Sequence, residues 1–444
     1  MTRNQSLASV LNTLRVTMQH LRTSATQAVV AGVLMVTGTP TLAQGVPASF
    51  DCDLAERTVD RFICVHADLR WQDLALSRSY AAARAATSGS DREQLVHSQR
   101  DWVRERDRRC VGDGTFKALS DTASPLGNLA YGCLSNAYLD RRKVLMDLAA
   151  TPHIPSTITP LDLSVIEEAR PELVTESGLR VVDIQSSPDG TLLAIILPSL
   201  EIDRPDQVWL YRVADGKQVA ATPQPDMNQP HPDDAPMAVE ILTWHDGTLY
   251  TRVTAWGAGD DPEHNPDTIH AATMDGHRPL TSIPDDVRAW IDAARPDPVS
   301  PDEVAADDRE IPDSVRSTHD FLVWNEDFGH GTIELKMRAR SPDASTYRIA
   351  WGSWDLLSYV LNRTLSQIVY AANTGIVVFD MATHQERRIA GTARGDRPYG
   401  VSDDGRLLIW STQGNCGDER LEEPPDEAPE RFCMARLPSS TPGG

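Results

Sequence analysis

Residues 50–148 have a hydrophobic pattern with helical spacing. In 67–86, Leu69, Asp73, Leu76 and Tyr80 recur every three or four residues, which places them on one face of an α-helix. The same pattern predicts four helices in this region. They are 53–64, 67–86, 91–109 and a last helix that begins at residue 127 or 128. Ser90 followed by Glu93 is typical of a capping box and predicts the start of the third helix.

Beyond residue 171 the pattern changes to short apolar runs. The runs 192–197 and 208–211 each adjoin an Asp-Gly pair, at 189–190 and 215–216. An Asp-Gly pair between apolar runs is a strong β-hairpin signal, because the turn needs residues that tolerate positive φ. This part of the chain is therefore predicted to be all-β.

The pair of hairpins recurs along the chain. Further Asp-Gly turns stand at 246–247, 275–276 and 404–405, and a four-stranded unit of about 55 residues repeated in this way predicts a β-propeller. We expect about five blades in 172–440, with a β-sandwich as the alternative. A Pro/Asp-rich insertion at 283–312 interrupts the third unit and includes a predicted short helix at 285–294.

The first 43 residues predict an export signal. The leader carries Arg3, Arg15 and Arg22 and no acidic residue, and an apolar run at 28–36 precedes a small-residue site at 41–43. That run is too short to span a membrane, so we predict a signal peptide cleaved after Ala43 and a periplasmic protein without a membrane anchor.

Charge and proline divide the rest of the chain. The Pro/Thr-rich segment 151–171 is predicted to be an extended, semi-rigid linker between a helical domain at 50–150 and the β domain at 172–440. All of the net negative charge of −22 comes from 151–444, because 51–150 balances to zero and 1–50 is basic. So acidic a domain argues against nucleic acid as a partner and favours a cationic protein, although solubility alone also explains it.

The six cysteines form three local pairs. They are Cys52 and Cys64, Cys110 and Cys133, and Cys416 and Cys433. None has CxxC or zinc-finger spacing, so we predict disulfides in an oxidising compartment rather than a metal site. Spacing leaves the connectivity of the first four open, and we favour sequential pairing.

A set of polar and aromatic residues accompanies the first four cysteines. They are Asp73, Tyr80, Gln99, Trp102, Arg106, Tyr138 and Arg141. Their order resembles the lysozyme inhibitor LprI-type N-terminal domain family over about residues 50–148, although Gln72 stands where that family usually has an apolar residue. The resemblance implies an exported, helical, disulfide-bonded domain that inhibits lysozyme and has no catalytic residues. The Ser-Pro-Asp-Gly turns of the β domain resemble those of TolB-type envelope propellers.

We interpret the seven residues as structural, because periodic aromatic positions usually mark a buried face. Asp73 is expected to form an interhelical ion pair with Arg106 or Arg141. An inhibitor must instead present exposed groups to a catalytic cleft. The segment 111–125, between Cys110 and Cys133, is our candidate for that role, with Phe116 as an anchor.

The β domain contains no recognisable catalytic motif. It lacks G-x-S-x-G, P-loop and H-E-x-x-H sequences, so we predict no enzyme activity and no cofactor. The richest polar cluster is interpreted as a solvated loop rather than a metal site. It comprises Asp260, Asp261, Glu263, His264 and His270. The acidic segment between Cys416 and Cys433 is the most negative local feature and suggests electrostatic attraction of a cationic lysozyme.

Two functions follow from the sequence. In the first, a periplasmic binding protein inhibits a cell-wall lytic enzyme through its helical domain, and the propeller is a second protein-binding platform. In the second, the protein is an envelope interaction or sensor protein, and the helical domain is only structural.

Overall fold

The computed structural model describes residues 48–438 with gaps. The gaps are 113, 121–124, 150–154, 156, 177, 199–205, 223–236, 256–267, 295–314, 328–331, 342–343, 354–356 and 420–427. Residues Val46–Gly444 group into one compact unit. The predicted signal peptide and its cleavage site lie outside the described residues. In the part that is described, no helix is both long enough and apolar enough to cross a membrane.

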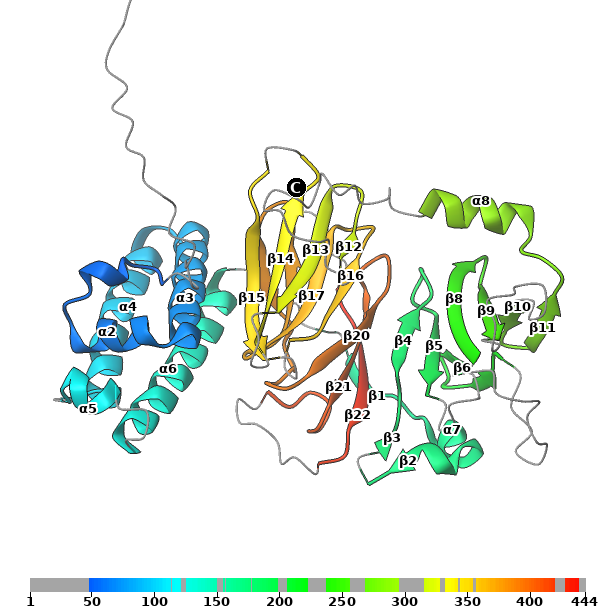
Figure 1. The fold of residues 1–444 in the computed structure, drawn as a ribbon, viewed down its shortest axis with the longest axis horizontal. Coiled ribbons are helices and arrows are strands. Elements are labelled where there is room, and N and C mark those ends of the chain that lie inside the picture. Colours follow the sequence, from blue (N-terminus) through cyan, green and yellow to red (C-terminus); the bar gives the residue numbers. More distant parts are fainter. Residues whose placement is uncertain are drawn as a thin grey trace, which may run out of the picture. The chain divides into compact units, whose positions relative to one another are not determined.

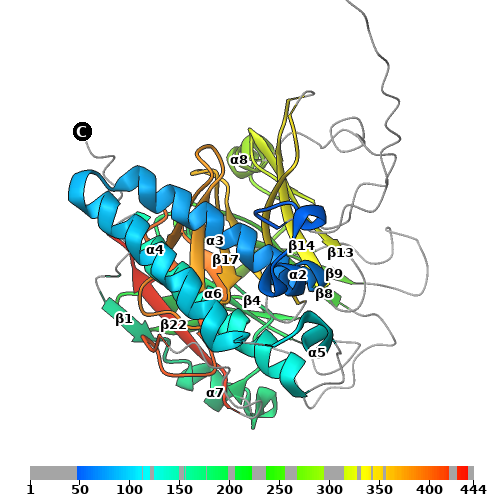
Figure 2. The same ribbon diagram turned by 90° about the vertical axis from the view of Figure 1, so that its left-hand side faces the viewer.

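The N-terminal domain is helical, as predicted (Figure 1). Its elements are η1 (Cys52–Leu54), α2 (Thr58–Val65), α3 (Ala67–Ala86), α4 (Gly89–Cys110), α5 (Phe116–Ser120) and α6 (Pro125–Ala149). The core lies between α3 and α6, which run side by side (Figure 2), and is filled by Phe62, Leu69, Leu134 and Tyr138. Apolar positions three or four residues apart therefore face one another across this pair of helices.

The helix boundaries differ from the prediction at several places. The predicted helix 53–64 is divided into η1 and α2, with residues 55–57 between them. The capping box predicted at Ser90 is wrong, because α4 begins at Gly89 and its N-cap is Ser88, which makes no side-chain capping hydrogen bond. The last helix begins at Pro125, earlier than predicted. Proline is favoured in the first turn of a helix, where its missing N–H would have had no partner within the helix.

Three disulfides join the cysteines in the sequential pattern. Cys52 bonds Cys64, Cys110 bonds Cys133, and Cys416 bonds Cys433. The first holds η1 to the end of α2, and the second holds the end of α4 to α6. Each therefore closes a short loop, which limits the conformations of the unfolded chain.

The C-terminal part consists of five four-stranded antiparallel sheets and one small two-stranded sheet, β2–β3, among the described residues. The strands are β1 (Thr157–Pro160), β2 (Val174–Thr175), β3 (Gly178–Leu179), β4 (Asp183–Ser186), β5 (Leu192–Leu197), β6 (Gln207–Arg212), β7 (Gln218–Ala220), β8 (Met237–His245), β9 (Thr248–Ala255), β10 (Thr268–Thr273), β11 (Gly276–Leu280), β12 (Arg316–Ser317), β13 (Phe321–Asp327), β14 (Thr332–Ala339), β15 (Tyr347–Ser353), β16 (Tyr359–Asn362), β17 (Gln367–Ala372), β18 (Gly375–Asp380), β19 (Gln385–Arg388), β20 (Arg397–Val401), β21 (Leu407–Thr412) and β22 (Arg431–Arg436).

The predicted Asp-Gly turns connect these strands. Gly190, Gly216 and Gly405 have φ of +64°, +70° and +67°, a region that glycine enters at no steric cost. At the turn between β8 and β9, Asp246 and Gly247 both have positive φ, of +48° and +71°. That combination is typical of a type I′ hairpin.

Neighbouring sheets share hydrophobic cores. Sheet β4–β7 packs on β8–β11, β12–β15 on β16–β19, and β16–β19 on the last sheet, β20–β22 with β1. The last sheet packs in turn on the first, β4–β7. Sheets that follow one another in this way are blades of a β-propeller. Among the described residues, no hydrophobic cluster joins β8–β11 to β12–β15, and the insertion at 283–312 lies between those two blades in the chain.

Two connecting segments have secondary structure. The helix predicted within the insertion is α8 (Asp285–Ala294). In the segment predicted to be an extended linker, the structure contains β1, α7 (Ser164–Ala169) and the beginning of η2 (Pro171–Leu173). Strand β1 pairs with β22 from Thr157↔Arg436 to Pro160↔Cys433. The segment just after the helical domain therefore completes the last blade.

Candidate functional site

The residues of the LprI-like pattern contact one another across α3, α4 and α6. The Tyr138 hydroxyl donates to Asp73 Oδ1 at 3.0 Å and accepts from Arg106 Nη1 at 2.8 Å. The Arg106 guanidinium lies over the Trp102 ring at 5.2 Å from its centroid. Burial, together with the Asp73 carboxylate, raises the pKa of Tyr138 well above its ordinary value. At neutral pH this tyrosine therefore stays protonated and bridges the two charged side chains.

The predicted direct ion pair between Asp73 and Arg106 or Arg141 is wrong: among the described residues, neither arginine contacts the Asp73 carboxylate. Arg106 pairs with the adjacent Asp107, at 2.6 Å, and reaches Asp73 only through Tyr138. Arg141 instead donates to Gln99 Oε1 at 2.8 Å, which joins α6 to α4. Tyr80 packs against the core of the domain. Asp73 and Arg106 are therefore joined through the Tyr138 hydroxyl rather than by direct contact.

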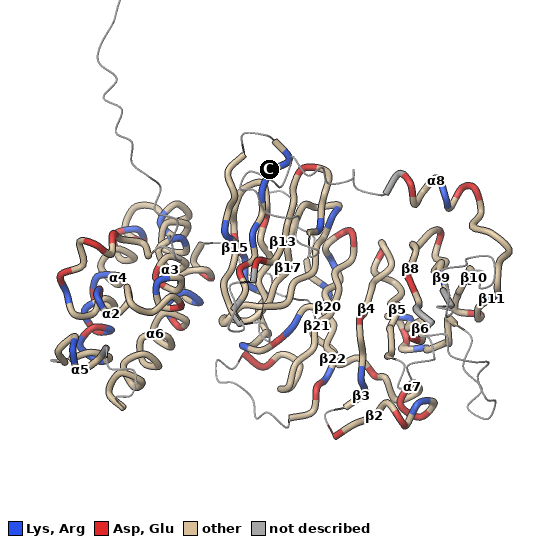
Figure 3. Tube along the Cα trace, in the orientation of Figure 1, with Lys and Arg blue, Asp and Glu red and all other residues tan. Residues whose placement is uncertain are grey.

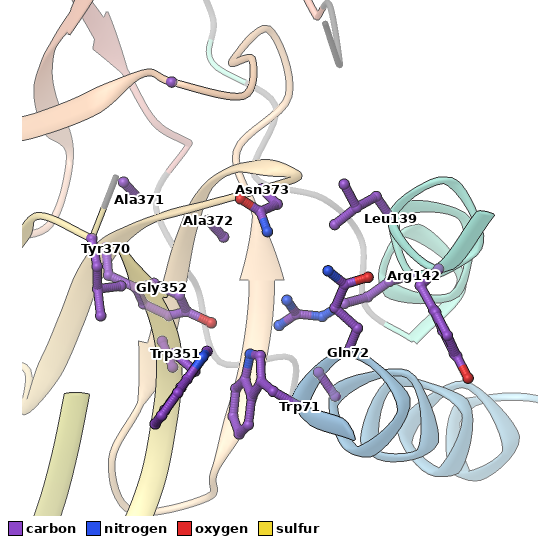
Figure 4. Close-up of a pocket in the computed structure, with 15 residues that line it drawn as sticks. Trp71, Gln72, Leu139, Arg142, Trp351, Gly352, Tyr370, Ala371, Ala372 and Asn373 are labelled. Atoms are coloured by element: carbon purple, nitrogen blue, oxygen red, sulfur yellow. The ribbon is translucent and has the colours of Figure 1, made fainter. Parts of the chain in front are cut away.

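A second polar cluster joins the helical domain to the propeller. Arg142 on α6 donates to Glu386 Oε2 on β19 at 2.7 Å, and Tyr370 on β17 donates to Glu386 Oε1 at 2.9 Å. Burial disfavours the charge of Arg142, but Glu386 and Tyr370 keep its pKa above the ordinary value. Figure 4 shows Arg142 reaching from α6 toward the strands, beside Trp71 and Trp351.

Further contacts extend this joint. Asp68 Oδ1 accepts from Trp351 Nε1 at 2.9 Å, and Arg78 Nη1 donates to the Arg348 carbonyl at 2.8 Å. Arg388 pairs with Asp147 at 3.2 Å. These contacts come from α3 and α6. The propeller therefore covers a face of these two helices that would otherwise be open to solvent. Sequence reasoning missed the joint, since its partners are far apart in the chain.

The cavity at the joint is too small for a ligand. Its volume is about 30 Å³, and its lining includes Gln72, Tyr138, Arg142 and Asn373. A space of this size holds on the order of one or two water molecules. The joint is therefore a packed contact between domains.

The segment 111–125 differs from the predicted loop. Residues Phe116–Ser120 form the short helix α5, and the Arg61 guanidinium lies 4.2 Å from the centroid of the half-buried Phe116 ring. Residues 113 and 121–124 lie outside the described part. Phe116 thus packs against its own domain in this structure, and its proposed role as an anchor remains a prediction.

The two polar clusters of the β domain are only partly described. Of the cluster at 260–270, four residues lie outside the described part, and His270 is a buried residue of β10. Within the described ranges, no group of three or more His, Cys, Asp or Glu side chains could hold a metal ion.

Glu419, in the acidic C-terminal segment, contacts α6 and the Gly391 backbone. Its Oε2 accepts from Lys143 Nζ at 2.8 Å and its Oε1 accepts from the Gly391 amide at 2.7 Å. Partial burial would raise the pKa of Glu419, but these donors and Arg388 hold it below the ordinary value. This carboxylate therefore binds the chain's own α6, and residues 420–427 lie outside the described part.

Lys, Arg, Asp and Glu are interspersed along both domains (Figure 3). The helices carry interspersed Lys, Arg, Asp and Glu, with ion pairs such as Arg104–Asp101 and Arg108–Glu105 on the exposed face of α4. Exposed pairs of this kind contribute little to stability. They leave the helical domain close to neutral overall, so local clusters decide where a charged partner is attracted.

Comparison with solved structures shows distant likeness to propeller-containing proteins. One is described as the crystal structure of TolB from Acinetobacter baumannii, at 14% identity, covering 59% of this chain and 56% of that chain, with a TM-score of 0.23. Another is puromycin hydrolase, at 12% identity, covering 58% of this chain and 46% of that chain, with a TM-score of 0.24. The present chain thus spans about half of each of those chains. No curated protein matches it.

The helical domain has a family match of its own. Residues 52–145 match the sequence model of the family described as "Lysozyme inhibitor LprI". The matched range includes the first two disulfides and the whole set of residues that bridge α3, α4 and α6. Residues 52–145 therefore resemble LprI lysozyme inhibitor domains in sequence.

Proposed function

We propose that this protein is an exported periplasmic inhibitor of a lysozyme-type cell-wall lytic enzyme. The helical domain binds the enzyme, and the propeller is a second platform for protein binding, without enzymatic activity of its own. The observation that carries the proposal is the LprI domain at 52–145. That domain and the three disulfides indicate an extracytoplasmic protein, which supports export through the predicted signal peptide.

A second function is favoured by a different observation. The family-pattern residues Asp73, Arg106 and Tyr138 are buried, and α3 and α6 contact the propeller through buried charges such as Arg142. In this alternative, the helical domain is a structural part of an envelope interaction or sensor protein. It then predicts a rigid two-domain protein that does not slow cell-wall lysis.

Inhibition of lysozyme separates the two functions. Purified residues 46–444, which form one compact unit, would be titrated against a cationic lysozyme in a turbidity assay with cell walls as substrate. Inhibition that reaches completion near equal molar amounts supports the first function. Full lysozyme activity at a large molar excess of the protein removes it and leaves the second. N-terminal sequencing of the exported protein tests cleavage after Ala43.

A further inference from the structure

One corner of the helical domain presents an unusually exposed apolar side chain. Leu54 in η1 is 76% exposed, the largest value among the large hydrophobic residues described, and Val65 at the end of α2 is 55% exposed. The Cys52–Cys64 disulfide, with a Cα–Cα distance of 5.7 Å, brings these two elements together. Exposed apolar side chains on linked elements are candidates for protein binding.

The backbone around Leu54 is held in place. Asp51 Oδ1 accepts from the Asp53 amide at 2.9 Å, and the Ser49 amide donates to Asp73 Oδ2 at 2.8 Å. The Phe50 side chain packs on the hydrophobic core of the domain. The exposed leucine is thus presented in a defined position, and a partner that binds it loses little conformational freedom in this segment.

Acidic side chains surround this leucine in the sequence. Asp51, Asp53 and Glu56 are exposed, and none of them forms an ion pair within the described part of the chain. By contrast, the nearby Arg57 is paired with Asp107. The corner therefore offers three carboxylates to a partner, beside an apolar centre.

We propose that the acidic corner, defined as Asp51, Asp53, Leu54, Glu56 and Val65, is the surface that binds the lytic enzyme. The inference rests on the proposed function and names its contact surface and the charge of its partner. A cationic lysozyme complements the three carboxylates, and the net charge of −22 steers it toward the chain. Among the described residues, the contacts of the joint come from α3 and α6 and not from this corner.

Two variants separate the apolar contribution to lysozyme binding from the electrostatic contribution. Leu54→Ser removes the apolar centre and is expected to weaken binding to a purified cationic lysozyme by about tenfold or more, mainly through faster dissociation. Asp53→Asn with Glu56→Gln keeps the side-chain shapes. This double variant is expected to slow association several-fold at low salt, and the difference should shrink at higher salt.

Matched controls come from the same domain. Leu129→Ser alters another exposed leucine, at 69% exposure, and Asp91→Asn with Glu93→Gln removes two exposed carboxylates of α4. Each control is expected to bind within about twofold of the unchanged protein. All variants should melt together with it, because every substituted side chain is exposed.

The outcomes distinguish the inference from the function. Selective loss of binding in the acidic-corner variants supports the inference. If the unchanged protein binds lysozyme and the acidic-corner variants bind as the controls do, the surface is wrong and the proposed function stands. If the unchanged protein does not bind lysozyme, both the surface and the proposed function fail.

Discussion

The Arg142–Glu386 pair offers a sharp test of the joint between domains. Arg142→Met removes the guanidinium and leaves the Glu386 carboxylate without its cation. The two side chains are 9% and 17% exposed and lie 2.7 Å apart. Breaking a buried pair by removing one partner costs about 3–5 kcal/mol. Because Tyr370 still donates to Glu386, we expect Arg142→Met to lower the free energy of unfolding by about 3 kcal/mol, the low end of that range.

A double-mutant cycle isolates the contribution of the Arg142–Glu386 pair to the free energy of unfolding. Denaturant unfolding of residues 46–444 would be compared for Arg142→Met, Glu386→Met and the double variant. The double variant should lose clearly less than the sum of the two single losses, because it leaves no unpaired buried charge.

An exposed pair provides the control for this cycle. Arg104→Met breaks the pair with Asp101, whose side chains are 76% and 68% exposed, and should cost about 0–1 kcal/mol. Equal losses for Arg142→Met and Arg104→Met, or additive losses in the cycle, would refute the buried joint.

Three further predictions concern single positions. Tyr138→Phe removes the hydroxyl that bridges two charged side chains and should cost about 1–3 kcal/mol in unfolding free energy; an unchanged denaturation midpoint would contradict the bridge. Gly190→Ala and Gly247→Ala both place alanine at positive φ, of +64° and +71°, but only at Gly190 would the new Cβ lie 3.0 Å from Leu407 Cβ and 3.3 Å from Ser402 Cβ. The Gly190 variant should therefore melt lower than the Gly247 variant, and equal melting would show that the backbone at Leu407 and Ser402 yields. Because the pKa of Glu419 is held below its ordinary value, its contribution is present above the unfolded pKa of about 4.3 and is lost as pH falls through the lower folded pKa. Glu419→Gln should flatten the fall in melting temperature between about pH 5 and 3, and an unchanged pH profile would count against this role.

Local signals predicted much of the fold. The helix at Ala67–Ala86 and the short helix at Asp285–Ala294 have the predicted bounds, and the Asp-Gly turns connect strands where expected. In each case the determining interactions lie within a few residues along the chain. Helical spacing of apolar residues determines the helices, and the steric freedom of glycine determines the turns.

Long-range pairing is what the sequence did not show. Strand β1 has only four residues, and its partner β22 lies at the other end of the chain. Arg142 and Glu386 are 244 positions apart, and nothing in the local sequence of either residue indicates the other.

Titration of a cationic lysozyme with residues 46–444 tests the central claim most directly. The account predicts that cell-wall lysis stops near equal molar amounts, and that Leu54→Ser requires about tenfold more protein while Leu129→Ser does not. Undiminished lysis at a large molar excess of the unchanged protein would contradict the claim.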